Sequence, residues 1–114
     1  MDELRRYIIT YYAYLMTDKE AKAQRTLITR EKISRIEGTL LAEKMRERWM
    51  SNDPEVLAII ANGETQFYDL LCARILREHS HEIFFNHCPQ CNALARTPKA
   101  KQCPSCFHSW HDNE

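Results

Sequence analysis

The sequence predicts a mainly α-helical protein, a small helical bundle followed by a short C-terminal module of a different kind. Only two glycines and four prolines occur among 114 residues, and 28% of the chain is charged. This composition favours helices, because glycine and proline are the residues that helix interiors tolerate least. Apolar residues recur at helical spacing until His87, beyond which this period is lost. We therefore predict a helical domain over residues 1–85 and a separate module over residues 86–114.

The overall charge and the cysteine count limit the classes of partner and compartment. Sixteen basic and sixteen acidic residues cancel, so no long-range field draws the whole surface to nucleic acid or to an anionic membrane. Five cysteines leave one unpaired in any disulfide framework, which indicates a reducing compartment. The apolar run at residues 7–16 contains four tyrosines and is far shorter than the ~20 residues of a membrane span. We expect a cytoplasmic protein with no membrane partner.

The first predicted helix covers residues 4–16. Its apolar side chains form two adjacent stripes at helical spacing, which indicates a broad buried face. A strand is the alternative, since tyrosine, isoleucine and threonine also suit pleated surfaces. Thr17 stands three residues before Glu20 in the arrangement of a capping box, so a second helix should begin there.

The stretch from Asp18 to Met50 favours helix throughout, but its apolar stripe changes phase. A single helix of that length would be long for so small a domain. We therefore expect one bent helix or two helices, with Thr29 and Gly38 as the candidate breaks.

The clearest boundary in the chain follows at Asp53 and Pro54. Aspartate can cap a helix, and proline suits the first helical turn because its missing N–H has no partner there. A short helix should run to Ala61, and after the stop at Gly63 another amphipathic helix should end near His79. The apolar residues expected to close around one another in the helical part are Tyr7, Ile8, Tyr11, Leu15, Leu27, Ile36, Leu40, Leu57, Ile60, Phe67, Leu71 and Ile75.

Four cysteines near the C-terminus have the spacing of a tetrahedral metal site. Cys88 and Cys91 form one CPxC pair, and Cys103 and Cys106 form a second. Zinc prefers four ligands in a tetrahedron, and each CxxC turn brings two sulfurs close enough to share one ion. We predict one structural zinc per chain, held by these four residues. Iron suits the same four thiolates, and two disulfides or free thiols are a further alternative. Cys72 is expected to be a buried small hydrophobe.

The two CPxC pairs resemble the knuckles of the zinc-ribbon family, in which two knuckles on short hairpins hold one structural zinc. The resemblance covers the segment 86–111 and implies that its four cysteines are the metal ligands. The chain as a whole is also similar to small uncharacterised bacterial proteins with a helical N-terminal part and a zinc-ribbon tail. That likeness implies no activity.

Other features of the C-terminal segment complete this interpretation. Residues 94–97 and 103–110 could form short β-strands on either side of a turn. His108 and His111 could offer nitrogen ligands, but four sulfurs already satisfy the metal. Phe107 and Trp110 could cover the cysteine hairpins, or stack on a nucleobase or fill a pocket of a partner, but we favour packing of the segment onto the helices.

The residue after each CxxC pair bears on the shape of its knuckle. Zinc knuckles often place glycine there, because the backbone takes a left-handed turn. Asn92 tolerates that conformation, whereas Phe107 adopts it with difficulty, so we expect the second knuckle to be distorted or wider.

Function is constrained mainly by exclusion. Four cysteines leave zinc no open position, and no phosphate loop or nucleophile and base pair is recognisable, so we expect no enzyme and no small-molecule substrate. The leading hypothesis is a protein-interaction or regulatory module that binds a protein partner or forms a homo-oligomer. The alternative is a nucleic-acid-binding protein that uses the cysteine segment and its neighbours Arg96, Lys99 and Lys101.

Overall fold

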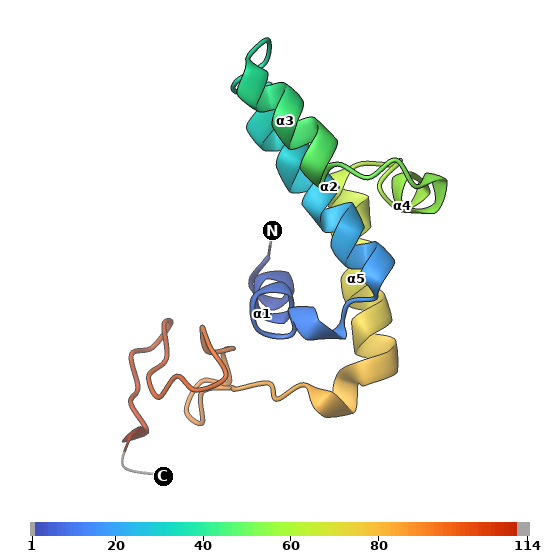
Figure 1. Ribbon diagram of the computed structural model, residues 1–114. Helices are drawn as coiled ribbons and strands as arrows, with labels where there is room; N and C mark the ends of the chain where they lie inside the picture. Colours follow the sequence, from blue (N-terminus) through green and yellow to red (C-terminus); the bar gives the residue numbers. More distant parts are fainter. Residues whose placement is uncertain (1, 112–114) are drawn as a thin grey trace. The chain divides into compact units, whose positions relative to one another are not determined.

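The computed structural model describes residues 2–111, and within them the chain is mainly helical (Figure 1). The helices of these residues are α1 (Glu3–Tyr11), α2 (Asp18–Ser34), α3 (Leu40–Trp49), α4 (Pro54–Ile59) and α5 (Glu64–His79), with short 3₁₀ helices η1 (Ala13–Leu15) and η2 (Ser80–Glu82). None of these helices combines the length and the apolar character that crossing a bilayer requires.

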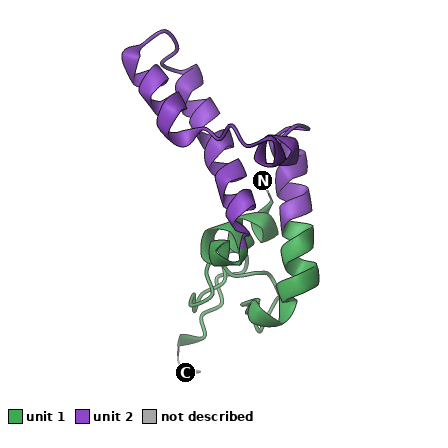
Figure 2. Cartoon of the chain, turned by 45° about the vertical axis from the view of Figure 1, so that its right-hand side comes forward, with its two compact units in different colours: residues 1–15, 72–114 green, residues 16–71 purple. Residues whose placement is uncertain are grey.

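Contacts divide the chain into two compact units (Figure 2). Unit 1 contains residues 1–15 and 72–114, and unit 2 contains residues 16–71. The N-terminal helix thus belongs to the same unit as the C-terminal cysteines, although the whole of unit 2 separates them in sequence. The boundary predicted after residue 85 concerns independent folding and stays a prediction.

The first helix is shorter than the sequence predicts. Asp2 caps its start by accepting a hydrogen bond from the Arg5 N–H at 2.8 Å, but the α-helix ends at Tyr11 instead of continuing to residue 16. The Tyr12 hydroxyl accepts a hydrogen bond at 3.0 Å from the backbone N–H of Phe84. This tertiary contact accompanies a change from α-helix to a 3₁₀ turn in the last part of the predicted segment.

The second helix begins as predicted. Thr17 Oγ1 accepts from the Glu20 N–H at 3.1 Å, while Glu20 Oε1 accepts from the Thr17 N–H at 2.8 Å. These reciprocal bonds form the expected capping box, which satisfies two backbone donors that a helix start would otherwise leave without partners.

The stretch from Asp18 to Met50 forms two helices, α2 and α3, that lie side by side (Figure 1). Gly38 lies in the turn between them with a φ of +85°, a conformation that glycine adopts without strain. Thr39 then caps α3 by accepting from the Ala42 N–H at 3.1 Å. The other predicted break, at Thr29, is wrong, because Thr29 is buried within α2.

The remaining boundaries follow the local signals closely. Asp53 accepts a hydrogen bond from the Glu55 N–H at 2.9 Å, and Pro54 occupies the first turn of α4. Gly63 has a φ of +95° and precedes α5, which ends at His79 as predicted.

Each unit buries its own set of apolar side chains. Unit 2 buries apolar side chains on α2, α3, α4 and the start of α5, and α4 lies against α2. Two expected core residues are exposed instead, Tyr11 at 41% and Leu40 at 66%. The buried hydrophobic residues of unit 1 are Tyr7, Ile8, Tyr12, Cys72, Ile75, Ile83, Cys88, Ala95, Cys103 and Trp110.

The short β-strands predicted at 94–97 and 103–110 are not confirmed in the described part of the chain. Only two isolated antiparallel bridges occur there, between His87 and Leu94 and between Gln102 and Ser109. Each bridge closes one CPxC turn, and the last two residues of each turn direct their backbone N–H groups at sulfur atoms instead of a neighbouring strand.

Candidate metal centre

The four cysteines that the sequence singles out come together in unit 1. The sulfur atoms of Cys88, Cys91, Cys103 and Cys106 all lie within 4.8 Å of one another. The Cys88 and Cys106 sulfurs are 3.6 Å apart, and the Cys91 and Cys103 sulfurs are 3.5 Å apart. Both of these short distances join one CPxC turn to the other, so the two turns face each other through their sulfur atoms.

These distances match a tetrahedral metal site and not a pair of disulfides. Bonds of about 2.3 Å from zinc to sulfur place neighbouring sulfurs of a tetrahedron about 3.8 Å apart. A disulfide would require about 2.05 Å, and all four cysteines are free. The donor set therefore fits one divalent ion that prefers thiolate ligands.

The first knuckle directs its backbone donors at its own sulfurs. Cys88 Sγ accepts from the N–H groups of Gln90 and Cys91, both at 3.4 Å, and Cys91 Sγ accepts from the Ala93 N–H. The turn is closed by the Asn92 N–H, which donates to the Cys88 carbonyl at 2.9 Å. Such donors stabilise thiolate charge, which matters because four thiolates and one divalent ion carry two net negative charges.

The second knuckle repeats this pattern. Cys103 Sγ accepts from Ser105 N–H at 3.3 Å and from Cys106 N–H at 3.4 Å, while Cys106 Sγ accepts from the His108 N–H. Phe107 N–H donates to the Cys103 carbonyl at 3.1 Å and closes the turn. The two knuckles therefore present their sulfur atoms in equivalent ways.

Phe107 adopts the left-handed backbone conformation, which is unfavourable for a residue with a bulky side chain. Its φ of +65° equals that of Asn92 in the first knuckle. The prediction of a distorted or wider second knuckle is wrong, since the hydrogen bonds of the two turns agree to within 0.2 Å. This backbone conformation costs a bulky residue roughly 1–2 kcal/mol of free energy. Burial of the phenyl ring offsets little of this cost, because 71% of Phe107 is exposed.

The four thiols have unequal proton affinities when no ion neutralises them. The backbone hydrogen bond from Cys106 lowers the pKa of Cys103 to about 6, a shift that the burial of Cys103 opposes. At Cys91 the backbone hydrogen bond from Ala93 acts in the same direction, but hydrogen bonds with the Cys103 and Cys106 thiols outweigh it and raise the pKa to about 12. Neutral pH therefore leaves the cluster partly protonated, and a divalent cation would favour its full ionisation.

Trp110 covers the cluster from within the module. It is 9% exposed and packs with Cys88, Cys103 and Ala95, while the His108 ring stacks on it with centroids 6.1 Å apart. The prediction that Phe107 and Trp110 pack the segment onto the helices is therefore wrong, because Trp110 packs within the module and Phe107 is exposed. In the described residues the group of close ligand atoms contains cysteine sulfurs only, and neither His108 nor His111 belongs to it.

Asn86 is a structural residue that sequence reasoning missed. It is 6% exposed, and its Nδ2 donates to the carbonyls of Thr97 and Ala100, both at 2.9 Å. Its own carbonyl accepts from the Ala95 N–H at 2.7 Å. One amide side chain thus fixes the loop between the two knuckles. The available signal was a polar residue that directly follows Ile83-Phe84-Phe85.

Two tyrosines of the N-terminal segment hold the chain that leads into the first knuckle. The Tyr7 hydroxyl donates to the Phe84 carbonyl at 2.5 Å and accepts from the Asn86 N–H at 3.3 Å. The Tyr7 ring stacks on Phe85 with centroids 6.4 Å apart. Burial raises the pKa of Tyr7, so its hydroxyl keeps its proton and remains a donor.

No protein-family model, curated protein or solved structure matches this chain.

Proposed function

We propose that the chain is a non-enzymatic protein in which one structural zinc ion shapes a protein-interaction or regulatory module. The observation that carries the zinc assignment is the cluster of four sulfurs within 4.8 Å of one another, each accepting a backbone hydrogen bond. Four thiolates fill a tetrahedral coordination sphere, whereas catalytic zinc keeps a position for water or substrate. The ion would hold the two knuckles together without performing chemistry.

Elemental analysis of the purified chain tests the metal assignment. We expect one zinc per chain, and Cys91→Ser should reduce the zinc content strongly because it removes one of four ligands. Cys72→Ser is the matched control, since Cys72 lies on α5 outside the cluster. Zinc-free protein with four freely titratable thiols would refute the proposal, and stoichiometric iron would correct the metal.

Exposed apolar side chains on the α2–α3 pair support the protein-interaction part of the proposal. Contiguous exposed apolar surface commonly marks a place where another protein binds. Four large apolar residues of these two helices are exposed by between 41% and 66%: Ile28, Leu40, Leu41 and Trp49. A change of oligomeric state with concentration in light scattering would identify the partner as a second copy of the chain.

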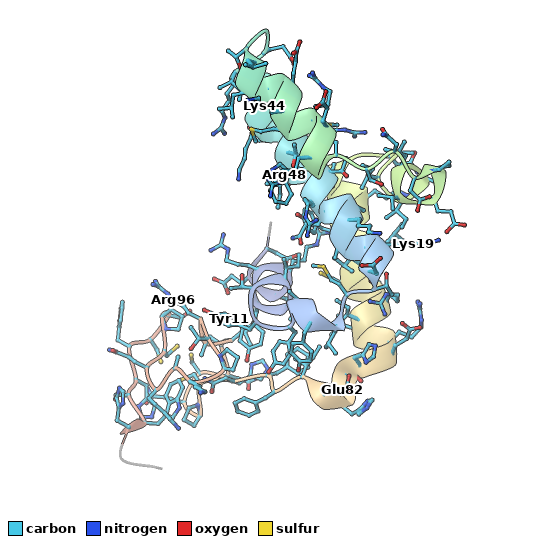
Figure 3. The ribbon with its side chains drawn as sticks, in the orientation of Figure 1. Tyr11, Lys19, Lys44, Arg48, Glu82 and Arg96 are labelled. Atoms are coloured by element: carbon cyan, nitrogen blue, oxygen red, sulfur yellow. The ribbon has the colours of Figure 1, made fainter. Side chains whose placement is uncertain are left out.

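A second candidate function, nucleic-acid binding, is favoured by a groove inside unit 1. The groove has a volume of about 530 Å³ and is lined by α1, by residues 94–96 between the knuckles and by the second knuckle. Arg6 and Arg96 contribute cations to it, and Tyr11, which is 41% exposed, contributes an aromatic ring. Figure 3 labels Tyr11 on α1 and Arg96 on the loop between the knuckles. Basic grooves with exposed aromatic rings are typical of sites for single-stranded nucleic acid.

Fluorescence anisotropy with a labelled single-stranded oligonucleotide tests this second candidate. Binding should weaken steeply with salt, since it would depend on a few phosphate contacts. Reversing the charges of Arg96, Lys99 and Lys101 should abolish it, while Arg77→Glu on α5 serves as the control. An affinity that survives the triple reversal would exclude the cysteine module as the binding surface.

A further inference from the structure

The α2–α3 pair carries a groove of about 520 Å³ whose lining is both apolar and basic. We call it the α2–α3 groove and define it by Arg25, Ile28 and Lys32 of α2 and Met45 and Trp49 of α3. The three α2 residues follow one another at intervals of three and four, so they share one face of that helix. The two α3 residues are four apart and share a face in the same way. Both faces thus contribute to one continuous surface within unit 2.

The indole ring of Trp49 brings together Arg25, which lines this groove, and Arg48, which lines a neighbouring hollow that shares Arg25 and Trp49. The guanidinium carbon of Arg25 lies 5.5 Å from the centroid of the ring, and that of Arg48, labelled on α3 in Figure 3, lies 5.1 Å from it. Such cation–π contacts hold each guanidinium in place with its N–H groups still able to donate. Two like charges from different helices therefore converge on one aromatic side chain.

Several basic residues of the α2–α3 pair have an acidic partner, whereas among the described residues the cations at this groove, like Arg30 and Lys44, have none at ion-pair distance. Within the described residues, no carboxylate lies at ion-pair distance from Arg25, Lys32 or Arg48. Neighbouring basic residues do have such partners, at 3.1, 2.9 and 2.7 Å in the pairs Lys22–Asp18, Arg35–Glu31 and Arg46–Glu37. The groove thus concentrates positive charge that the chain itself leaves unneutralised beside apolar surface.

We propose that the α2–α3 groove docks an acidic amphipathic helix of a partner protein. This inference rests on the proposed role as a protein-interaction module and specifies its surface and the chemistry of its partner. Apolar residues of the partner would pack on Ile28, Met45 and Trp49, as in other complexes in which a helix lies in a groove. Its carboxylates would pair bidentately with the arginines at the rim.

The spacing of the cations sets the expected pattern of the partner helix. Arg25 and Lys32 are seven residues apart on α2, which corresponds to about 10.5 Å along the helix axis. Two carboxylates seven residues apart on a helix running alongside α2 would reach both cations. Nucleic acid suits this surface less well, because a phosphate backbone makes no use of Ile28 and Met45 and the Trp49 ring is already engaged by two guanidinium groups.

Selection from a displayed library of random peptides of about 20 residues, the length of an ordinary partner helix, tests the proposal. The bait is the full zinc-loaded chain, and binding of the selected peptides is then measured by fluorescence anisotropy. We expect acidic amphipathic peptides whose affinity falls by about tenfold or more with Arg25→Glu, because a buried ion pair becomes a repulsion. The matched control is Arg30→Glu, an equal change of net charge at an exposed residue of α2 outside the groove.

A second variant separates apolar docking from simple charge attraction. Ile28 is 45% exposed, so Ile28→Gln should leave the fold intact yet weaken the selected peptides about as much as the charge reversal. Peptides that bind with an affinity that neither variant changes would show that the groove is not the binding surface. The proposed role as a protein-interaction module would still hold. A library that yields no binder would contradict both the groove proposal and the proposed role as a protein-interaction module. Single-stranded DNA that binds more tightly than any peptide, and is released by Arg25→Glu, would overturn the proposal in favour of nucleic acid.

Discussion

The cysteine module and unit 2 differ in what their residues offer for stability. In the module, residues 86–111, the donors within each CPxC turn are directed at sulfur, and the buried hydrophobic cluster comprises only two cysteines, Ala95 and Trp110. Unit 2 instead buries apolar side chains from four helices, including Val56, Ile60 and Phe67. If the module binds the proposed zinc, we expect its shape to depend on coordination chemistry, whereas that of unit 2 depends on removal of apolar surface from water.

Metal removal should produce the largest difference in stability between the cysteine module and unit 2. Structural zinc contributes about 10–16 kcal/mol to the folding of small zinc modules, far more than the module's apolar cluster can supply. Chelation should abolish amide protection in residues 87–111 while the amides of α2, α3 and the start of α5 keep theirs, as hydrogen exchange would report. Most of the far-ultraviolet helical signal should persist. A cooperative loss of that signal would instead show that the metal is a condition for the whole fold.

A change of pH should affect the metal affinity of the cysteine module but not the thermal stability of unit 2. Cys91, with its pKa raised to about 12, is protonated at neutral pH and must lose its proton to bind, whereas Cys103, with a pKa near 6, is already largely thiolate. Each proton released strengthens binding about tenfold per pH unit as pH rises, or ~1.4 kcal/mol. Competition with a chromophoric chelator between pH 6 and pH 8 measures this slope. The thermal stability of unit 2 should change little over that range, and a metal affinity independent of pH would contradict the protonation state assigned to Cys91.

Replacing Asn86 should weaken the module without touching unit 2. Asn86→Ala removes both side-chain bonds to the loop between the knuckles and leaves two carbonyls short of a partner, which costs about 1–3 kcal/mol. Zinc affinity should fall correspondingly in chelator competition. Gln90→Ala alters an exposed residue of the same module and should leave the affinity near that of the parent protein. Equal losses in both variants would mean that Asn86 has no special role.

The smallest expected effect is stronger metal retention when the backbone strain at Phe107 is removed. Phe107→Gly should strengthen metal retention by ~1 kcal/mol, because glycine adopts a φ of +65° without steric cost. Phe107→Ala removes the ring but keeps the Cβ atom, so it isolates the contribution of the ring itself. If both variants weaken retention to the same degree, the exposed ring stabilises the module and the strain argument fails.

Local signals in the sequence were reliable guides to this fold. The capping box at Thr17, the stop at Gly38 and the start at Asp53 each depend on residues within a few positions of one another, and all three are confirmed. The clustering of the four cysteines is of the same kind, because each CxxC turn places two sulfurs by local geometry alone. Only the meeting of the two turns depends on the intervening loop.

Features that depend on distant partners could not be predicted. Nothing near Tyr7 or Tyr12 in the sequence indicates that their hydroxyls bind the backbone at Phe84. Leu40 fits the apolar period of its helix, yet it is exposed, because periodicity identifies a face and not what covers it. At Phe107 the demands of the knuckle override the conformational preference of the side chain.

The equivalence of the two knuckles bears on how this protein can change over evolutionary time. The cluster consists of four thiols and of peptide N–H groups that donate to their sulfur atoms, and every residue except proline supplies such an N–H. Positions such as Gln90, Ser105 and Phe107 can therefore drift while the ligand geometry persists. In a centre of this kind the ancestry is recorded in the spacing of its cysteines more durably than in the residues between them.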